Sequence, residues 1–153
     1  MPVQIVIADP ASPEARACLT AYFALLAEKI DGISATHVPD PDPDAHLFRP
    51  PLGIFLLARD GDRVLGCVSL KELAPGIGEV KRLWIDPAAR GQGLGRQLME
   101  SVEDAARAMG LVSLQLDTNA ALTEAIALYT RTGWTPTAPY TQFPATHWFS
   151  KRL

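Results

Sequence analysis

The chain has 153 residues, of which 48% are hydrophobic and 20% are charged, a composition that excludes a disordered chain. This length is typical of one domain, and because no linker-like stretch divides it, we expect residues 1–153 to form a single domain. The formal net charge of −3 argues against nucleic-acid binding, which usually needs a basic face. The sequence has no apolar run of about 18 residues and no signal-peptide pattern, so we expect a cytoplasmic protein without a membrane partner.

The first third of the chain predicts a strand, a helix and a long loop. Val3 to Ala8 is a short apolar strand. Ser12 and Pro13 supply an N-cap and a proline at the first helical position. The helix that follows carries its apolar residues on one face, namely Leu19, Tyr22, Phe23, Leu26 and Ile30. Residues 31–51 are rich in proline, aspartate and histidine, which indicates a loop with room for one helical turn.

The central part predicts an antiparallel hairpin, a further strand and a helix. Strand-like runs at residues 53–59 and 63–73 are joined by Asp60 and Gly61, which tolerate the positive φ of a tight turn. Residues 79–86 form the next strand. Apolar residues then recur at helical spacing until Gly110, at Leu94, Leu98, Val102, Ala105 and Met109.

The last third returns to strands around one more helix. Residues 112–117 form an apolar strand, and a helix ends near Gly133 with Ala125, Ile126, Leu128 and Tyr129 as its apolar positions. Two final strands are predicted at residues 134–137 and 147–152. This order predicts an α/β (α+β) fold with a central antiparallel meander and a crossover helix. Cys18 and Cys67 lie in apolar patterns and are expected to be buried free thiols.

A glycine-rich turn, Arg90-Gly91-Gln92-Gly93-Leu94-Gly95, stands between the strand at 79–86 and the helix that follows. Such a turn is typical of an anion site, because the first N–H groups of the helix are free and glycine lets a phosphate approach the main chain. A P-loop would need Lys and then Ser or Thr where Arg96 and Gln97 stand, and the dinucleotide fingerprint needs three glycines in its own order, early in the chain. The structural alternative is a helix that simply begins with a tight turn.

Two segments carry a resemblance to a known family. Arg90-x-x-Gly93-x-Gly95 after Leu83-Trp84-Ile85-Asp86-Pro87 resembles the acetyl-CoA signature of the GCN5-related N-acetyltransferase (GNAT) superfamily. Ala125 to Tyr129, followed by Arg131-Thr132-Gly133-Trp134, resembles the late helix of the family and its turn into an aromatic-led strand. The resemblance implies a mixed, mostly antiparallel sheet flanked by helices, with the pyrophosphate turn after the fourth strand.

The resemblance also implies a cofactor site for acetyl-CoA, the acyl donor, without a metal. Main-chain amides near the end of the cofactor strand would polarise the thioester carbonyl, while Leu83, Trp84 and Ile85 would pair with the pantetheine arm. The turn residues expected to bind the cofactor are Arg90, Gly91, Gln92, Gly93, Leu94, Gly95 and Arg96. Many relatives place an asparagine seven residues before the tyrosine, where this chain has Leu122. Either Asn119 replaces that contact or the contact is missing.

Two residues are the candidates for proton transfer. Tyr129, at the family position, would protonate the departing thiolate, and the alternative is a core aromatic residue. Glu79 is the candidate base, and the alternative is an exposed strand glutamate paired with Lys81 and Arg82. His147 and Trp148 are candidates for the acceptor side, although a lone histidine is more often structural. His37 and His46 lack metal-ligand spacing.

The predicted function is an acetyl-CoA-dependent N-acetyltransferase that acts on an amine of a small-molecule or peptide acceptor by direct attack in a ternary complex. A homodimer is one option for its assembly. Two alternatives are a non-catalytic acyl-CoA-binding module for sensing or assembly, and a nucleotide-binding protein. The loop residues Asp40, Asp42 and Asp44 either steer a cationic acceptor or keep a solvated loop soluble. Neither the acceptor nor the acyl-chain preference can be read from the sequence.

Overall fold

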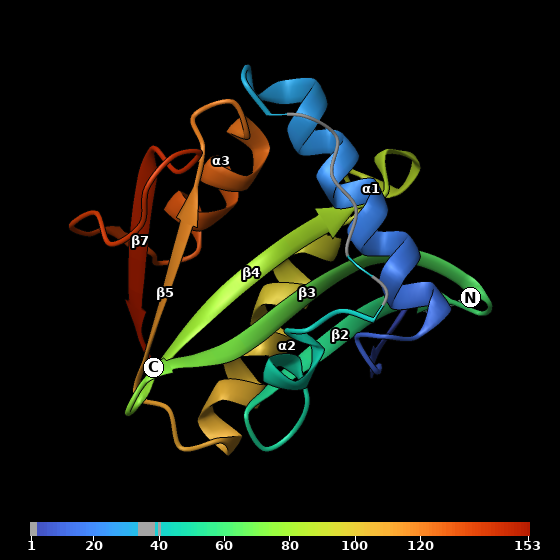
Figure 1. The fold of residues 1–153 in the computed structure, drawn as a ribbon, viewed down its shortest axis with the longest axis horizontal. Coiled ribbons are helices and arrows are strands. Elements are labelled where there is room, and N and C mark those ends of the chain that lie inside the picture. The colour runs from blue at the N-terminus through green and yellow to red at the C-terminus, as the bar shows by residue number, and fades with distance from the viewer. Residues whose placement is uncertain (1–2, 34–38, 40) are drawn as a thin grey trace.

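The structure, a computed structural model, describes residues 3–33, 39 and 41–153 (Figure 1). Its strands are β1 (Gln4–Ile7), β2 (Gly53–Asp60), β3 (Arg63–Ala74), β4 (Ile77–Ile85), β5 (Ser113–Thr118), β6 (Thr135–Pro136) and β7 (His147–Arg152). They form one sheet in the order β1-β2-β3-β4-β5-β7-β6, in which only the β4–β5 pair is parallel. The predicted mixed, mostly antiparallel sheet is confirmed.

The helices cover both faces of this sheet (Figure 1). They are α1 (Pro13–Lys29), α2 (Leu94–Ala108) and α3 (Thr123–Arg131), with two short 3-10 helices, η1 (Ala45–Phe48) and η2 (Pro87–Ala89). Helix α1 crosses one face and contacts β3 and β4, whereas α2 lies behind the sheet against β2, β3 and β4. As predicted, the α1 N-cap is Ser12, whose side chain accepts a hydrogen bond from the Ala15 N–H, and Pro13 is the first helical residue.

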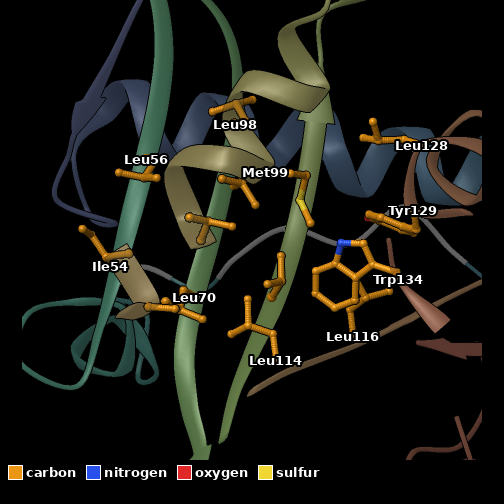
Figure 2. Packing of buried hydrophobic residues seen from close by; sticks show 14 of the residues in the cluster. Ile54, Leu56, Leu70, Leu98, Met99, Leu114, Leu116, Leu128, Tyr129 and Trp134 are labelled. Atoms are coloured by element: carbon orange, nitrogen blue, oxygen red, sulfur yellow. The ribbon is translucent and has the colours of Figure 1, made fainter. Parts of the chain in front are cut away.

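The larger part of the core lies between the sheet and α2. Figure 2 shows Leu98 and Met99 of α2 over Leu70 of β3 and Leu114 of β5, with Tyr129 beside them. A smaller cluster under α1 includes Cys18 and Cys67, and both thiols are buried and free, as predicted. At about 25 cal/mol per Å² of apolar area, burial of these side chains supplies the main force that holds the helices on the sheet.

Strand β4 begins two residues earlier than the sequence predicts. The predicted start was residue 79, but the strand includes Gly78 and begins at Ile77. A Cβ atom on Gly78 would lie 2.8 Å from side-chain carbons of Leu111 and Leu114, so a larger residue would force these side chains to shift where the chain that follows α2 packs over the strand. This glycine marks close packing rather than a turn.

Strands β4 and β5 separate after a short paired segment, and this separation forms a fork in the sheet (Figure 1). Residues 77–79 pair with residues 113–115, and no further pairs join the two strands. On its other edge β4 stays paired with β3 as far as Ile85, with a bulge near Arg82, whose φ is 61°. The edge of Leu83–Ile85 that faces β5 is therefore free of a strand partner within the described sheet. Within the described ranges, no helix is long and apolar enough to cross a bilayer.

Candidate active site

A cleft of about 240 Å³ lies at the open end of the fork. Nine of the ten residues predicted to bind the cofactor line it, namely Leu83, Trp84, Ile85, Arg90, Gly91, Gly93, Leu94, Gly95 and Arg96. The tenth, Gln92, is exposed and is not among the lining residues. The opposite wall comes from α1, through Tyr22, Leu25 and Lys29, and from residues 121–125 with Leu128 and Arg131 of α3.

The glycines of the turn meet two different needs. Gly91 and Gly93 have φ values of 81° and 76°, in the left-handed region that favours glycine, and a Cβ atom on either would meet no atom within 4 Å. The space in front of them is therefore open to a ligand. Gly95 instead faces α3, because a Cβ atom there would lie 3.0 Å from Cδ2 of Leu128. The sequence assigned Gly93 and Gly95 the same task, and Gly95, which also lines the cleft, has close helix packing as an additional one.

The start of α2 presents free N–H groups to the cleft. Gly93 is the N-cap residue and provides no side-chain cap, and the first turn contains no acidic residue. The backbone donors and the positive end of the helix dipole are therefore available to an anion. Arg90 and Arg96 add positive charge, and their partners are the exposed carboxylates of Glu124 at 3.4 Å and Glu100 at 3.1 Å. A pyrophosphate group fits this combination of donors and open space.

Tyr129 has features of both of its predicted roles. Its side chain is only 5% exposed and packs against Trp134 and Phe149 with ring centroids 6.0 and 5.9 Å apart, as in a core residue. It is not among the residues that line the cleft. Burial, with smaller contributions from Tyr22 and the Asp117 carboxylate, raises the pKa of the Tyr129 phenol. The phenol therefore keeps its proton at neutral pH, as a general acid requires.

Tyr22 is a second phenol, and it lines the cleft directly. Burial and, to a smaller extent, the Asp117 carboxylate raise the pKa of Tyr22 to about 12, although the Arg82 guanidinium opposes this rise. The sequence singled out Tyr22 only as one apolar-face residue of the first helix. Nothing in helical periodicity distinguishes a phenol that faces a cleft from one that packs in a core.

The shift at Tyr22 predicts a loss of stability at alkaline pH. The pKa is about 12 in the folded state and about 10 in an unfolded chain, so the phenol contributes no pH dependence below pH 10. Above pH 10 the unfolded state loses this proton first, and the free energy of unfolding falls between pH 10 and 12. We expect Tyr22→Phe to make this fall shallower in denaturant titrations at pH 9, 10 and 11. An identical slope in the two proteins would contradict the assignment.

Glu79 is buried. The alternative to its predicted role as a base was an exposed glutamate on the strand, and the predicted exposure is wrong. Its side chain is almost fully enclosed, with the residue 3% exposed, and Oε2 accepts a hydrogen bond from the Tyr140 hydroxyl at 2.9 Å. The Lys81 and Lys71 ammonium groups lie 3.5 and 3.7 Å from Oε1. Lys81 is thus a partner as predicted, but the second partner is Lys71 and not Arg82.

The replacement of Glu79 by glutamine should separate a structural role from a catalytic one. We expect Glu79→Gln to lower the free energy of unfolding by about 1 to 2 kcal/mol, because two ammonium groups lose their shared counter-charge. If Glu79 is also the base, the acidic limb of the rate profile should flatten. The control is Glu72→Gln, which changes an exposed glutamate of β3. An unaltered pH dependence in a destabilised Glu79 variant would leave Glu79 a structural residue.

Asp117 is a carboxylate at this site that the sequence analysis used only as part of a strand. It lies on β5 just beyond the paired segment, and its Oδ2 accepts a hydrogen bond from the Thr141 hydroxyl at 2.7 Å. The Trp148 indole donates to the same hydroxyl at 2.9 Å. The Asp117 charge also contributes to the raised pKa of three phenols, those of Tyr22, Tyr129 and Tyr140. In the sequence, the signal that could have indicated a role for Asp117 was an acidic residue at the end of a predicted apolar strand.

The other predicted positions have mostly local contacts. The Asn119 amide donates to the Pro144 carbonyl at 2.7 Å and accepts from the Ala121 N–H at 2.8 Å, while Leu122 lines the cleft. His147 is exposed and contacts the Thr146 hydroxyl. The remaining contacts are between His46 and the Pro43 carbonyl, and between Asp42 and the Asp44 N–H. His37 and Asp40 lie outside the described residues. In the described part of the chain, no three His, Cys, Asp or Glu side chains could hold a metal ion.

The fold of this chain is similar to that of solved acyltransferase structures. One, from Klebsiella pneumoniae and described as a candidate acyl-CoA N-acyltransferase, has a TM-score of 0.79 and 31% identity over 99% of this chain and 97% of its own. A candidate acetyltransferase from Salmonella typhimurium, solved with its cofactor acetyl-CoA, has a TM-score of 0.76 over 99% of this chain and 94% of its own. At 19% identity, the latter shows a shared fold alone.

The family follows from a sequence match. The model of the Acetyltransferase (GNAT) family matches residues 21–134, so the chain belongs to the GNAT acetyltransferases, as the resemblance predicted. The IAA acetyltransferase of Azospirillum brasilense is 41% identical over 103 residues, which are 65% of this chain and 67% of that protein. Other curated relatives are matched over 28% to 61% of their own length. The chain is an acetyl-CoA-dependent N-acetyltransferase.

Proposed function

We propose that this enzyme acetylates the amino group of a small molecule by direct attack in a ternary complex. The observation that carries the proposal is the cleft, which combines the uncapped start of α2, two open glycines and the free edge of β4. Relatives named for mycothiol and aminoalkylphosphonate support a small-molecule acceptor rather than a peptide. The homodimer and the cytoplasmic location stay predictions.

The donor would be held by main-chain groups. The N–H groups at the start of α2 would bind the pyrophosphate, with Gly91 and Gly93 giving it room and Arg90 and Arg96 adding charge. The free edge of Leu83–Ile85 would pair with the amides of the pantetheine arm as a further strand would. Acetyl-CoA supplies a thioester, whose carbonyl carbon is attacked by the amine. Backbone N–H groups near the Arg82 bulge would polarise the carbonyl.

Two proton transfers complete the chemistry. The attacking amine must lose a proton, for which we propose one of the two fork carboxylates, Glu79 or Asp117, and the thiolate must gain one. Tyr129 is proposed as the acid because it matches the family position and its raised pKa keeps it protonated. Tyr22 is the second candidate, because it has the same protonated phenol and lines the cleft.

The experiment that tests this function measures binding and turnover separately. Calorimetry should detect acetyl-CoA binding, and thiol release should appear when amines, amino acids, polyamines and aminoglycosides are added one by one. Binding without thiol release for any amine would favour the non-catalytic acyl-CoA-binding module. Stronger binding of ATP than of CoA would favour the nucleotide-binding alternative.

A further inference from the structure

The α1 face of the fork contains charged side chains from β3, β4 and β5. Three cations, Lys71, Lys81 and Arg82, share it with two anions, Glu79 and Asp117. Glu79 is fully engaged, because its carboxylate contacts both lysines and the Tyr140 hydroxyl. Arg82 and Asp117 take no part in this cluster of paired charges.

Arg82 and Asp117 lack an ion-pair partner among the described residues. Asp117 is half-buried, and its hydrogen-bond partner is the neutral Thr141 hydroxyl. The Arg82 guanidinium is also half-buried and stacks on aromatic rings, with its carbon 5.1 Å from the Phe48 centroid and 5.6 Å from that of Phe23. A partly buried charge is costly without a partner, which suggests that a ligand supplies one.

The two unpaired charges lie on opposite sides of the fork and next to the cleft. Arg82 belongs to β4 and Asp117 to β5, and the strands separate after residues 79 and 115. Both charges affect the pKa of the Tyr22 phenol, because Asp117 raises it and Arg82 lowers it. The geometry places them there as well, because the Arg82 guanidinium stacks on Phe23, whose ring centroid lies 5.4 Å from that of the cleft residue Tyr22. Asp117 lies on the strand that leads into residues 121–125 of the cleft wall.

The backbone conformation at Arg82 also indicates that this side chain has a specific role at the site. Among the described residues other than glycine, Arg82 alone has a positive φ, at 61°. A residue with a Cβ atom is strained in this conformation, whereas glycine would not be. Stacking between Phe23 and Phe48 then restrains the guanidinium, whose planar pair of N–H donors fits a carboxylate or a phosphonate.

We propose that the acceptor is a small zwitterion whose amino group is received by Asp117 and whose anionic group, a carboxylate or a phosphonate, is received by Arg82. This inference rests on the proposed function and names the acceptor class of the same site. Asp117 and Thr141 hold the amine end on β5, while Arg82 holds the acid end on β4, so that the amine points into the fork toward the thioester.

The test compares acceptors that differ only in their acidic group. Thiol release from acetyl-CoA is measured with glycine, β-alanine and phenylalanine against the three corresponding amides, and with 2-aminoethylphosphonate against ethylamine. At least one acid should exceed its neutral partner tenfold or more in kcat/KM, and the carboxylate and phosphonate arms identify which anion is preferred.

Variants of Arg82 and Asp117 separate recognition from packing. Arg82→Gln should raise the KM of the preferred acid at least tenfold while the amide is little affected, and Arg82→Lys should restore part of the preference because it keeps the charge. Asp117→Asn should lower kcat/KM for acids and amides alike. The matched control is Arg63→Gln, which changes an exposed arginine at the start of β3 that does not line the cleft.

Several outcomes would overturn the zwitterion proposal. One is an equal kcat/KM for amides and acids in the unaltered enzyme. Another is thiol release with polyamines or aminoglycosides alone. Both outcomes would leave the acetyltransferase function in place. If Arg82→Gln lowers kcat/KM equally for acids and amides and also lowers the Tm, Arg82 has only a structural role. If that variant does not fold, Arg82→Lys gives the same comparison. No thiol release with any amine would remove the proposed function as well.

Discussion

Gly93→Val is expected to weaken acetyl-CoA binding at least tenfold, or on the order of 1.4 kcal/mol. The glycine has a φ of 76° and faces open space at the mouth of the cleft. Valine would place a branched side chain where the pyrophosphate must approach the main chain, and its backbone would resist the left-handed conformation. Calorimetry with acetyl-CoA measures the change directly.

The control for backbone strain is Gly110→Val. Gly110 follows α2 and has a φ of 80°, and a Cβ atom on it would also meet no atom within 4 Å, but it does not line the cleft. The two variants should therefore lose similar stability, and only Gly93→Val should lose affinity. Unchanged affinity in a folded Gly93 variant would remove the anion site on which the cofactor assignment depends.

Tyr129→Phe is expected to lower kcat by roughly the 10²-fold that loss of a general acid causes, with little change in acetyl-CoA affinity. Phenylalanine keeps the packing against Trp134 and Phe149 and removes only the hydroxyl. The measurement is steady-state thiol release with a saturating acceptor.

The matched comparison is Tyr22→Phe, which removes the phenol that lines the cleft. If Tyr129 is the acid, Tyr22→Phe should have the smaller effect on kcat. The opposite ranking would assign proton donation to α1 and return Tyr129 to the core. Full activity in both variants would show that the thiolate leaves without help from either phenol.

The parts of the site that the sequence predicted are local along the chain. A helix start and its glycine turn depend on a few consecutive residues, so the cofactor turn could be read from residues 90–96. The same holds for the α1 N-cap and for the 3-10 turn within the long loop. Nine of the predicted cofactor positions consequently line one cleft.

The parts that the sequence missed depend on residues far apart in the chain. Glu79 accepts a hydrogen bond from a hydroxyl 61 positions away in the sequence, and Asp117 accepts one from a hydroxyl 24 positions away. Arg82 was paired with Glu79 because the two residues are close in sequence, but the Arg82 side chain stacks on Phe23 of α1 and Phe48 of η1. No periodic pattern in a single sequence encodes such contacts.

The connection between β6 and β7 contacts both carboxylates of the fork. Its neighbouring residues Tyr140 and Thr141 bond to Glu79 on β4 and Asp117 on β5, whereas the glycine turn and α2 belong to another part of the chain. In the proposed site, the position of the carboxylate that receives the acceptor amine depends on this connection, whereas the pyrophosphate turn does not. A new acceptor preference could evolve through changes in one short connection, while the machinery that binds the shared donor is inherited intact.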